Sequence, residues 1–104
     1  MNESKVRPWV MIKRVGDHVG REVTLKGWLY SKRSSGKIRF LVVRDGSGLI
    51  QVVMSRGEIP AEVFDLYDQL TQESSLAVTG RVCEEPRAPG GFELSLTGME
   101  LIQQ

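Results

Sequence analysis

The chain has 104 residues, which is the size of one small domain. This length excludes folds such as the TIM barrel, which takes about 250 residues. Hydrophobic residues at 40% and charged residues at 26% are ordinary for a soluble globular protein. The net charge of +1 conceals an asymmetry, because residues 1–44 contain 11 basic and 3 acidic side chains, whereas residues 45–104 contain 3 and 10. Such partition into a positive and a negative part is typical of proteins that bind nucleic acids or membranes.

The residue inventory argues against several kinds of site. Cys83 is the single cysteine and His18 the single histidine, so we expect no intramolecular disulfide, no metal site and an unreactive thiol. His18 lies beside Asp17 without a candidate nucleophile, which favours a surface pair over acid–base catalysis. No apolar run approaches the roughly 20 residues of a membrane span, and no signal peptide is evident. We therefore expect a cytoplasmic protein with no membrane partner.

We predict a single domain over residues 1–104, in which residues 1–20 are an N-terminal lead-in with a short helix. Residues 1–8 are polar and end in a proline. Apolar residues partly share one face over residues 9–19, which predicts the helix, and Gly20 is a plausible stop.

Three strand patterns follow. Residues 22–30 alternate apolar with polar side chains, and residues 37–45 and 49–55 are rich in β-branched and aromatic residues. Residues 31–36 (SKRSSG) predict a positively charged turn. Residues 45–48 (DGSG) predict a tight turn that Asp45 caps, which we favour over a catalytic role for that carboxylate. Short connections of this kind predict an antiparallel meander.

The periodicity then becomes helical. Apolar residues three and four positions apart predict an amphipathic helix from about residue 60 to residue 70, with acidic residues on its outer face. Residues 76–84 and 92–102 alternate again and predict two more strands, with a bend or bulge at Gly98. Residues 85–91, rich in proline and glycine, predict the loop between them.

The predicted order of elements is three strands, a helix and two strands. A small five-stranded sheet must protect its edges, and closure into a barrel does so. We therefore predict an all-β OB-fold, a five-stranded Greek-key barrel with a helix between strands 3 and 4. OB-folds bind oligonucleotides or oligosaccharides on the face of strands 2 and 3 and in the loops between strands 1–2 and 4–5.

A basic cluster lies in this expected binding region. Its members are Lys32, Arg33, Lys37, Arg39 and Arg44, with no acidic residue between positions 30 and 44. Such a cluster can neutralise phosphates, and the interleaved Trp28, Tyr30 and Phe40 can stack on unpaired bases. The alternative is a hairpin edge whose charges prevent aggregation. The position on an OB-fold favours nucleic-acid binding, with Lys32, Lys37 and Arg39 as candidate contacts beside Arg33.

Three residues allow two interpretations each. Phe40 shares strand parity with Ile38 and Val42, so taken alone it is expected in the core. Gln51 interrupts the apolar run LIQVVM, where its amide either reads a base edge or faces solvent. Glu93 follows two glycines and either accepts a hydrogen bond from a base amino group or faces solvent.

The run VTLKGWLYSKRSSGKIRFLVVRDGSGLIQVV (residues 23–53) closely resembles the N-terminal anticodon-binding domain of class IIb aminoacyl-tRNA synthetases, the enzymes for Asp, Asn and Lys. The combination of KRSSGKI, FLVVRDGSG and LIQ is most similar to the asparaginyl members. VTGRV (residues 78–82), RAPGGFEL (residues 87–94) and the opening IKRVGDHVGREV are similar to further elements of the family. The resemblance covers about residues 10–103.

The resemblance implies an OB-fold that binds the anticodon loop of tRNA. In the family, a phenylalanine stacks on the central uridine of the anticodon, and Phe40 matches it. Gln51 and Arg33 match the glutamine and arginine that read this base. Glu93 matches a glutamate that contacts an adjacent anticodon base. These implied roles favour the outward, base-contacting interpretation of all three ambiguous residues.

The family also has parts that are not recognisable in this chain. Its members continue into a class II catalytic domain that uses ATP and magnesium, and no Arg-rich motif of that domain occurs before Gln104. We therefore expect no catalytic residue and no cofactor in the chain, and no aminoacylation by it alone. It is either a fragment of a homodimeric synthetase or a free-standing relative, and we expect a monomer or weak dimer. The alternative function is a stand-alone OB-fold module that binds single-stranded nucleic acids or proteins.

Overall fold

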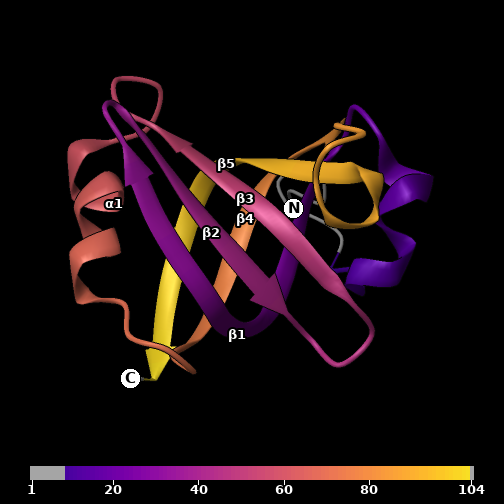
Figure 1. The fold of residues 1–104 in the computed structure, drawn as a ribbon, viewed down its shortest axis with the longest axis horizontal. Helices are drawn as coiled ribbons and strands as arrows, with labels where there is room; N and C mark the ends of the chain where they lie inside the picture. Colours follow the sequence, from indigo (N-terminus) through magenta and orange to yellow (C-terminus); the bar gives the residue numbers. More distant parts are fainter. Residues whose placement is uncertain (1–8, 104) are drawn as a thin grey trace, which may run out of the picture.

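The structure is a computed structural model that describes residues 9–103, so the predicted lead-in over residues 1–8 lies outside the described part. Five strands close into one barrel with the neighbour order β1-β2-β3-β5-β4 (Figure 1). The strands are β1 (Glu22–Ser35), β2 (Ile38–Arg44), β3 (Leu49–Ser55), β4 (Ser75–Glu84) and β5 (Phe92–Gln103). The helices are η2 (Ile12–His18), α1 (Ala61–Asp65), η3 (Leu66–Gln69) and η4 (Pro89–Gly91). The predicted all-β OB-fold is confirmed.

Antiparallel pairs join β1 to β2, β2 to β3, β4 to β5 and β1 to β4. A short parallel pair between β3 and β5, from Gln51↔Glu93 to Val53↔Ser95, closes the barrel. The predicted helix of residues 60–70 is confirmed as α1 continued by the 3₁₀ turn η3, in the connection between β3 and β4. The predicted irregularity in the last strand is also confirmed, because Thr79 pairs with Gly98 but the next residue of β4 pairs with Leu96.

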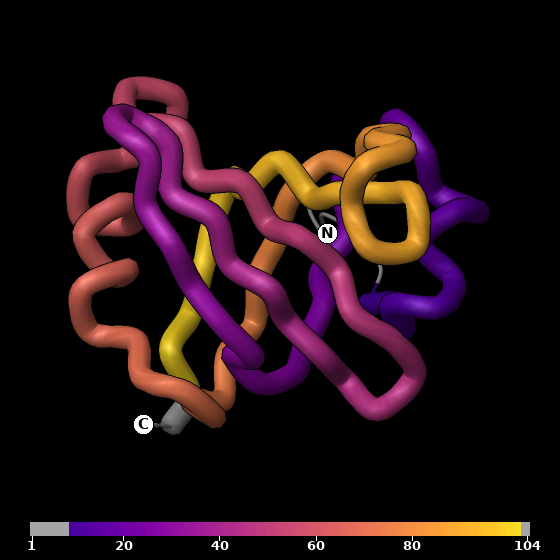
Figure 2. Tube along the Cα trace, viewed as in Figure 1, coloured from indigo at the N-terminus to yellow at the C-terminus, as the bar shows by residue number. Residues whose placement is uncertain are grey.

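The prediction of a turn over residues 31–36 is wrong. β1 continues to Ser35, and the chain reverses only at Gly36 and Lys37. Residues 31–35 are all exposed, so burial imposes no alternation on them, and backbone pairing with β2 holds them as a strand. β1 bends sharply near the bulge between Leu29 and Ser31; it pairs with β4 from Glu22 to Trp28 and with β2 from Trp28 onward (Figure 2).

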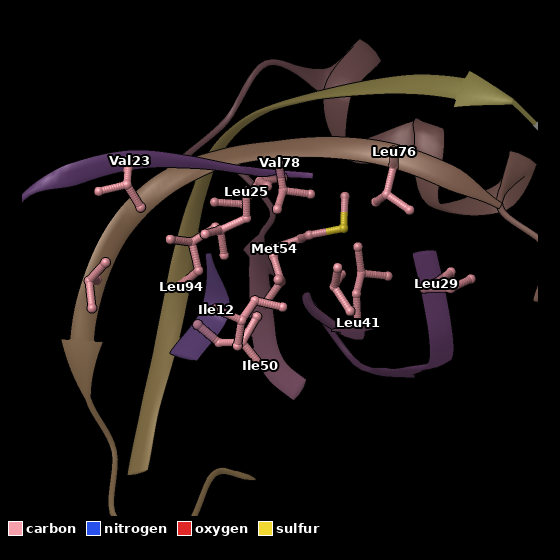
Figure 3. Packing of buried hydrophobic residues seen from close by; sticks show 14 of the residues in the cluster. Ile12, Val23, Leu25, Leu29, Leu41, Ile50, Met54, Leu76, Val78 and Leu94 are labelled. Carbon is pink, nitrogen blue, oxygen red and sulfur yellow. The ribbon is translucent and has the colours of Figure 1, made fainter. Parts of the chain in front are cut away.

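The core lies inside the barrel, where the inward faces of all five strands meet (Figure 3). Its fully buried side chains include Val23, Leu25, Leu29, Leu41, Val43, Ile50, Val52, Met54, Leu70, Leu76, Val78 and Leu94. Each contributes roughly 1.5–3 kcal/mol through removal of apolar surface from water. Leu41 and Val43 are the inward residues of β2, so Phe40 lies on the outside of the barrel. The interpretation of Phe40, taken by itself, as a core residue is therefore wrong.

Two glycines allow close approach of neighbouring strands, Gly27 between β1 and β2 and Gly80 between β4 and β5. A Cβ atom at Gly27 would lie 2.2 Å from the carbonyl oxygen of Arg44, and one at Gly80 would lie 2.3 Å from that of Ser95. Any other residue would force the neighbouring backbone apart. These contacts hold β2 and β5 in the positions from which their outward side chains project.

Asp45 anchors η2 to the turn between β2 and β3, which confirms the predicted turn cap. One carboxylate oxygen accepts hydrogen bonds from the Ser47 backbone N–H and hydroxyl at 2.8 and 2.6 Å, and the other accepts from the Ile12 N–H at 2.8 Å. Burial alone would raise the pKa of Asp45, but the bonds from Ser47, Ile12 and Gly48 together lower it below its ordinary value of 3.8. The charged carboxylate therefore stabilises this end of the barrel.

Candidate nucleic-acid interface

One outward face of the barrel collects the main candidate residues in two rows that cross neighbouring strands. The first row runs Arg33↔Phe40↔Val53↔Ser95, and the second runs Val42↔Gln51↔Glu93. Paired residues on neighbouring strands project to the same side of a sheet, so all seven side chains share one surface. We call this surface, defined by these seven residues, the Phe40 face.

Arg33 and Phe40 meet across the β1–β2 hairpin. The guanidinium carbon of Arg33 lies 4.0 Å from the centroid of the Phe40 ring, the geometry of a cation–π contact. Arg33 is exposed and Phe40 is half-buried. The pair thus offers a planar aromatic ring with an exposed cation above it, at the surface of the sheet.

Gln51 and Glu93 form the second pair of the face. The Gln51 Nε2 donates a hydrogen bond of 3.1 Å to the Glu93 Oε1, between side chains that are both half-buried. The parallel register of β3 and β5 places the two residues side by side. Within residues 9–103, no lysine or arginine forms an ion pair with Glu93. The pair presents amide and carboxylate groups that suit the edge of a base.

Lys32 and Arg39 lie on the opposite side of the hairpin, where η3 and α1 cover it. The Lys32 Nζ donates to the Tyr67 carbonyl oxygen at 2.8 Å and lies 4.5 Å from the Tyr67 ring centroid. The Arg39 guanidinium lies 4.5 Å from the Phe64 ring and 4.7 Å from the Tyr67 ring, and pairs with Asp68 at 3.4 Å. We call this the helix-covered side. The structure does not bring Lys32 and Arg39 together with Phe40.

The remaining members of the basic cluster are dispersed. Lys37 is exposed in the turn at the tip of the hairpin. The Arg44 guanidinium forms an ion pair with Glu73 at 3.2 Å. It also lies 5.8 Å from the ring of Trp28, the β1 residue with which Arg44 pairs in register. Trp28 and Tyr30 are exposed, but neither belongs to the two rows of the Phe40 face. Of the three interleaved aromatics, only Phe40 lies beside Gln51 and Glu93.

A pocket of about 590 Å³ lies where η2, the β2–β3 turn and the start of β5 converge, and the sequence analysis did not anticipate it. Its lining includes the cationic Lys13 and Arg14 and the aromatic Phe92, which directly precedes Glu93. A Cβ atom at Gly16 would lie 3.0 Å from the Phe92 ring, so this glycine lets η2 approach the ring closely. The glycines of the β2–β3 turn and of the loop before β5 were the available signal in the sequence. Their positions along the chain do not show that these two loops meet in space.

Among the described residues, no group of three or more His, Cys, Asp and Glu side chains could hold a metal ion. No helix within residues 9–103 is long and apolar enough to cross a membrane. Cys83 is a half-buried free thiol on β4, paired in register with Glu93.

Comparisons with known proteins agree with this geometry. The asparagine–tRNA ligase of Pelotomaculum thermopropionicum is 56% identical over 93 residues, covering 89% of this chain and 22% of the relative. That of Desulforamulus reducens is 55% identical over 92 residues, covering 88% and 21%. The crystal structure of asparaginyl-tRNA synthetase from Pyrococcus horikoshii superposes with a TM-score of 0.84 at 37% identity, covering 90% of this chain and 23% of that one.

The chain thus spans about a fifth of the length of the curated relatives that it matches. The tRNA anticodon family, described as an OB-fold nucleic acid binding domain, matches residues 23–102. This match covers all five strands except the first residue of β1 and the last of β5. The chain therefore belongs to the tRNA anticodon family of OB-fold nucleic-acid-binding domains.

Proposed function

We propose that this chain is the anticodon-binding domain of an asparaginyl-tRNA synthetase and that its partner is the anticodon loop of a tRNA. The observation that carries the proposal is the convergence of Arg33, Phe40, Gln51 and Glu93 on one outward face. The close similarity to asparagine–tRNA ligases supports the choice of enzyme.

The Phe40 face suits unpaired RNA. Single-stranded bases splay out and stack on aromatic side chains, and each such stack contributes roughly 1–3 kcal/mol. Phe40 is the ring for the central anticodon base, and the exposed Arg33 can move from above the ring to the edge of that base. Gln51 reads the same base with its amide, and Glu93 contacts the neighbouring base.

Phosphate contacts surround this face. Lys37 at the hairpin tip and the pocket residues Lys13 and Arg14 are exposed cations and are the candidates for these contacts. Lys32 and Arg39 are engaged with η3 and α1, which makes them weaker candidates for phosphates than Lys37. Their contact with nucleic acid stays a prediction.

The proposal gives this chain no catalytic role. Activation of asparagine with ATP and magnesium, and the dimerisation of the enzyme, are proposed for the remainder of a full-length ligase. A monomeric or weakly dimeric state and a cytoplasmic location for the chain stay predictions.

Titration of the chain with an anticodon stem-loop tests the proposal. We expect binding that weakens when the central uridine is replaced, and that weakens about 5- to 150-fold in each of Phe40→Ala and Gln51→Ala. Tyr30→Ala removes an exposed aromatic outside the Phe40 face and serves as the matched control. Absence of binding, or equal affinity for all loop sequences, would contradict the proposal and favour a general single-strand or protein-binding module.

A further inference from the structure

We propose that Glu93 is a positioning residue, which fixes the orientation of the Gln51 amide so that Gln51 selects uracil over cytosine. This inference rests on the proposed function, because it concerns the base that the Phe40 face would hold. It assigns Glu93 a role through Gln51, separate from a contact of its own with a neighbouring base.

The first step concerns the amide. A glutamine side chain ends in a donor and an acceptor of nearly equal shape, and rotation by half a turn exchanges them. A carboxylate only accepts hydrogen bonds. Because the Glu93 Oε1 lies 3.1 Å from the Gln51 amide, the donating Nε2 must face Glu93. The Gln51 Oε1 is then held in a single direction, available to an incoming donor.

The second step concerns what keeps the Gln51 and Glu93 side chains hydrogen-bonded to each other. Gln51 and Glu93 are register partners on parallel β3 and β5, so the backbone holds both side chains at adjacent positions. No ion pair from the described part of the chain draws the carboxylate away. The neighbours on either side in the row are Val42 and Cys83, and the Cys83 thiol is directed to the Arg81 carbonyl oxygen at 3.8 Å. Glu93 therefore has Gln51 as its hydrogen-bonding neighbour in the free protein.

The third step concerns the base. Uracil presents the N3–H donor beside the O4 acceptor, whereas cytosine presents the N3 acceptor beside the N4 amino donor. A locked amide offers its Oε1 to the N3–H of uracil and the second hydrogen of its Nε2 to a uracil oxygen. Against cytosine the same groups meet acceptor to acceptor and donor to donor. A free amide would rotate and accommodate cytosine, so the discrimination depends on Glu93.

Two stem-loops that differ only in a central U or C provide the test, since both bases have one ring and stack alike on Phe40. We expect the unmodified protein to bind the U loop roughly 5- to 150-fold more tightly, the range of one bidentate base contact. In Glu93→Gln the ratio of the two dissociation constants should fall towards 1, because the Gln51 amide can then turn to accommodate cytosine. A glutamine at this position both donates and accepts, so it tolerates either orientation of Gln51.

Matched variants separate this role from others. Glu100→Gln removes the same charge from an exposed position of β5 and should leave the ratio unchanged. Phe40→Ala should weaken both loops in proportion and preserve the ratio. A direct contact of Glu93 with a neighbouring base would weaken both loops equally in Glu93→Gln.

The possible outcomes distinguish failure of the inference about Glu93 from failure of the proposed function. If the unmodified protein binds neither loop, the proposed function fails. If it binds both equally, the reading of the central base fails and the inference fails with it. If it prefers the U loop and Glu93→Gln retains the full U-over-C ratio, the inference alone is overturned. NMR of the Gln51 side-chain amide gives a readout without RNA: the Nε2 proton that faces Glu93 should be displaced downfield from its ordinary position in glutamine, and this displacement should vanish in Glu93→Ala. Unchanged shifts in Glu93→Ala would overturn the inference.

Discussion

The two sides of the β1–β2 hairpin carry the same chemical motif in different surroundings. On the Phe40 face, Arg33 is exposed and lies 4.0 Å from a ring that is only half-buried. On the helix-covered side, Arg39 lies 4.5 Å from Phe64, a ring that is 2% exposed. The first stack can exchange its arginine for a ligand, whereas the second is closed by α1, η3 and the ion pair to Asp68.

This difference shows that charge density along the sequence is a poor guide to charge density on a surface. Lys32 and Arg33, like Arg39 and Phe40, are consecutive residues that strand alternation sends to opposite sides. Two of the five members of the basic cluster, Lys32 and Arg39, therefore hold the helix against the barrel. Variants that act on one side and spare the other test this division.

Phe64→Ala should have the largest effect. Removal of a buried aromatic ring costs about 3–5 kcal/mol of unfolding free energy. Phe40→Ala, the corresponding change on the open side, should cost far less, because its ring is only half-buried. Urea unfolding followed by circular dichroism measures both, and similar losses in the two variants would remove the distinction between the sides.

Phe40→Ala should instead weaken the binding of an anticodon stem-loop by about 1–3 kcal/mol, the contribution of one stacked base. Calorimetric titration at fixed salt concentration measures this loss. An affinity within twofold of that of the unmodified protein would show that the open ring is not used for stacking.

Arg39→Ala should lower the unfolding free energy by roughly 1–2 kcal/mol, because it removes two desolvated cation–π contacts and the packing of the arginine stem. Arg33→Ala should leave stability nearly unchanged and weaken RNA binding. Thermal unfolding and stem-loop titration of both variants form a two-by-two comparison. A crossed result, with Arg33 stabilising and Arg39 binding, would invert our assignment of the two sides.

Asp45 limits the pH range in which the two sides can be compared. Its pKa is lowered in the folded protein, so its stabilisation is complete above the unfolded-state value and is lost as the pH falls through the lower folded-state value. Asp45→Asn should cost about 0.5–2 kcal/mol at neutral pH, within the range of a lost charged cap, and should flatten the loss of stability in acid. Unfolding curves between pH 6 and pH 3 measure this, and an unchanged acid profile would exclude Asp45 as its source.

Lys37→Ala should have the smallest effect. If Lys37 contacts one phosphate, the slope of log affinity against log salt should decrease by about 0.7–0.9, equally for all loop sequences. Lys32→Ala is the matched change on the helix-covered side and should alter the slope less. Equal changes in the two variants would indicate that RNA reaches both sides of the hairpin.

The sequence was sufficient for the topology because five alternating segments and one helical segment admit few arrangements. It was insufficient to decide which side chains of β2 point into the barrel. In IRFLVV both the odd-numbered and the even-numbered positions include apolar residues, so Phe40 and Leu41 are equally plausible core residues. Residues 31–35 lack any pattern, since neither of their faces is buried, and the strand there was mistaken for a turn. Gln51 was identifiable as a polar residue in an apolar strand, but its bond to Glu93 depends on the β3–β5 register, which no local pattern reveals.

The parallel β3–β5 pair has a consequence for the order in which the domain acquires its parts. Arg33 and Phe40 belong to one hairpin with a two-residue turn, whose formation needs only local chain closure. Gln51 and Glu93 are 42 residues apart, and their contact requires closure of a long loop that contains α1 and β4. A partly folded chain can therefore present the stacking ring without the amide that discriminates between bases. Sequence-specific binding becomes a reporter of complete folding, whereas weak, indiscriminate binding is available earlier.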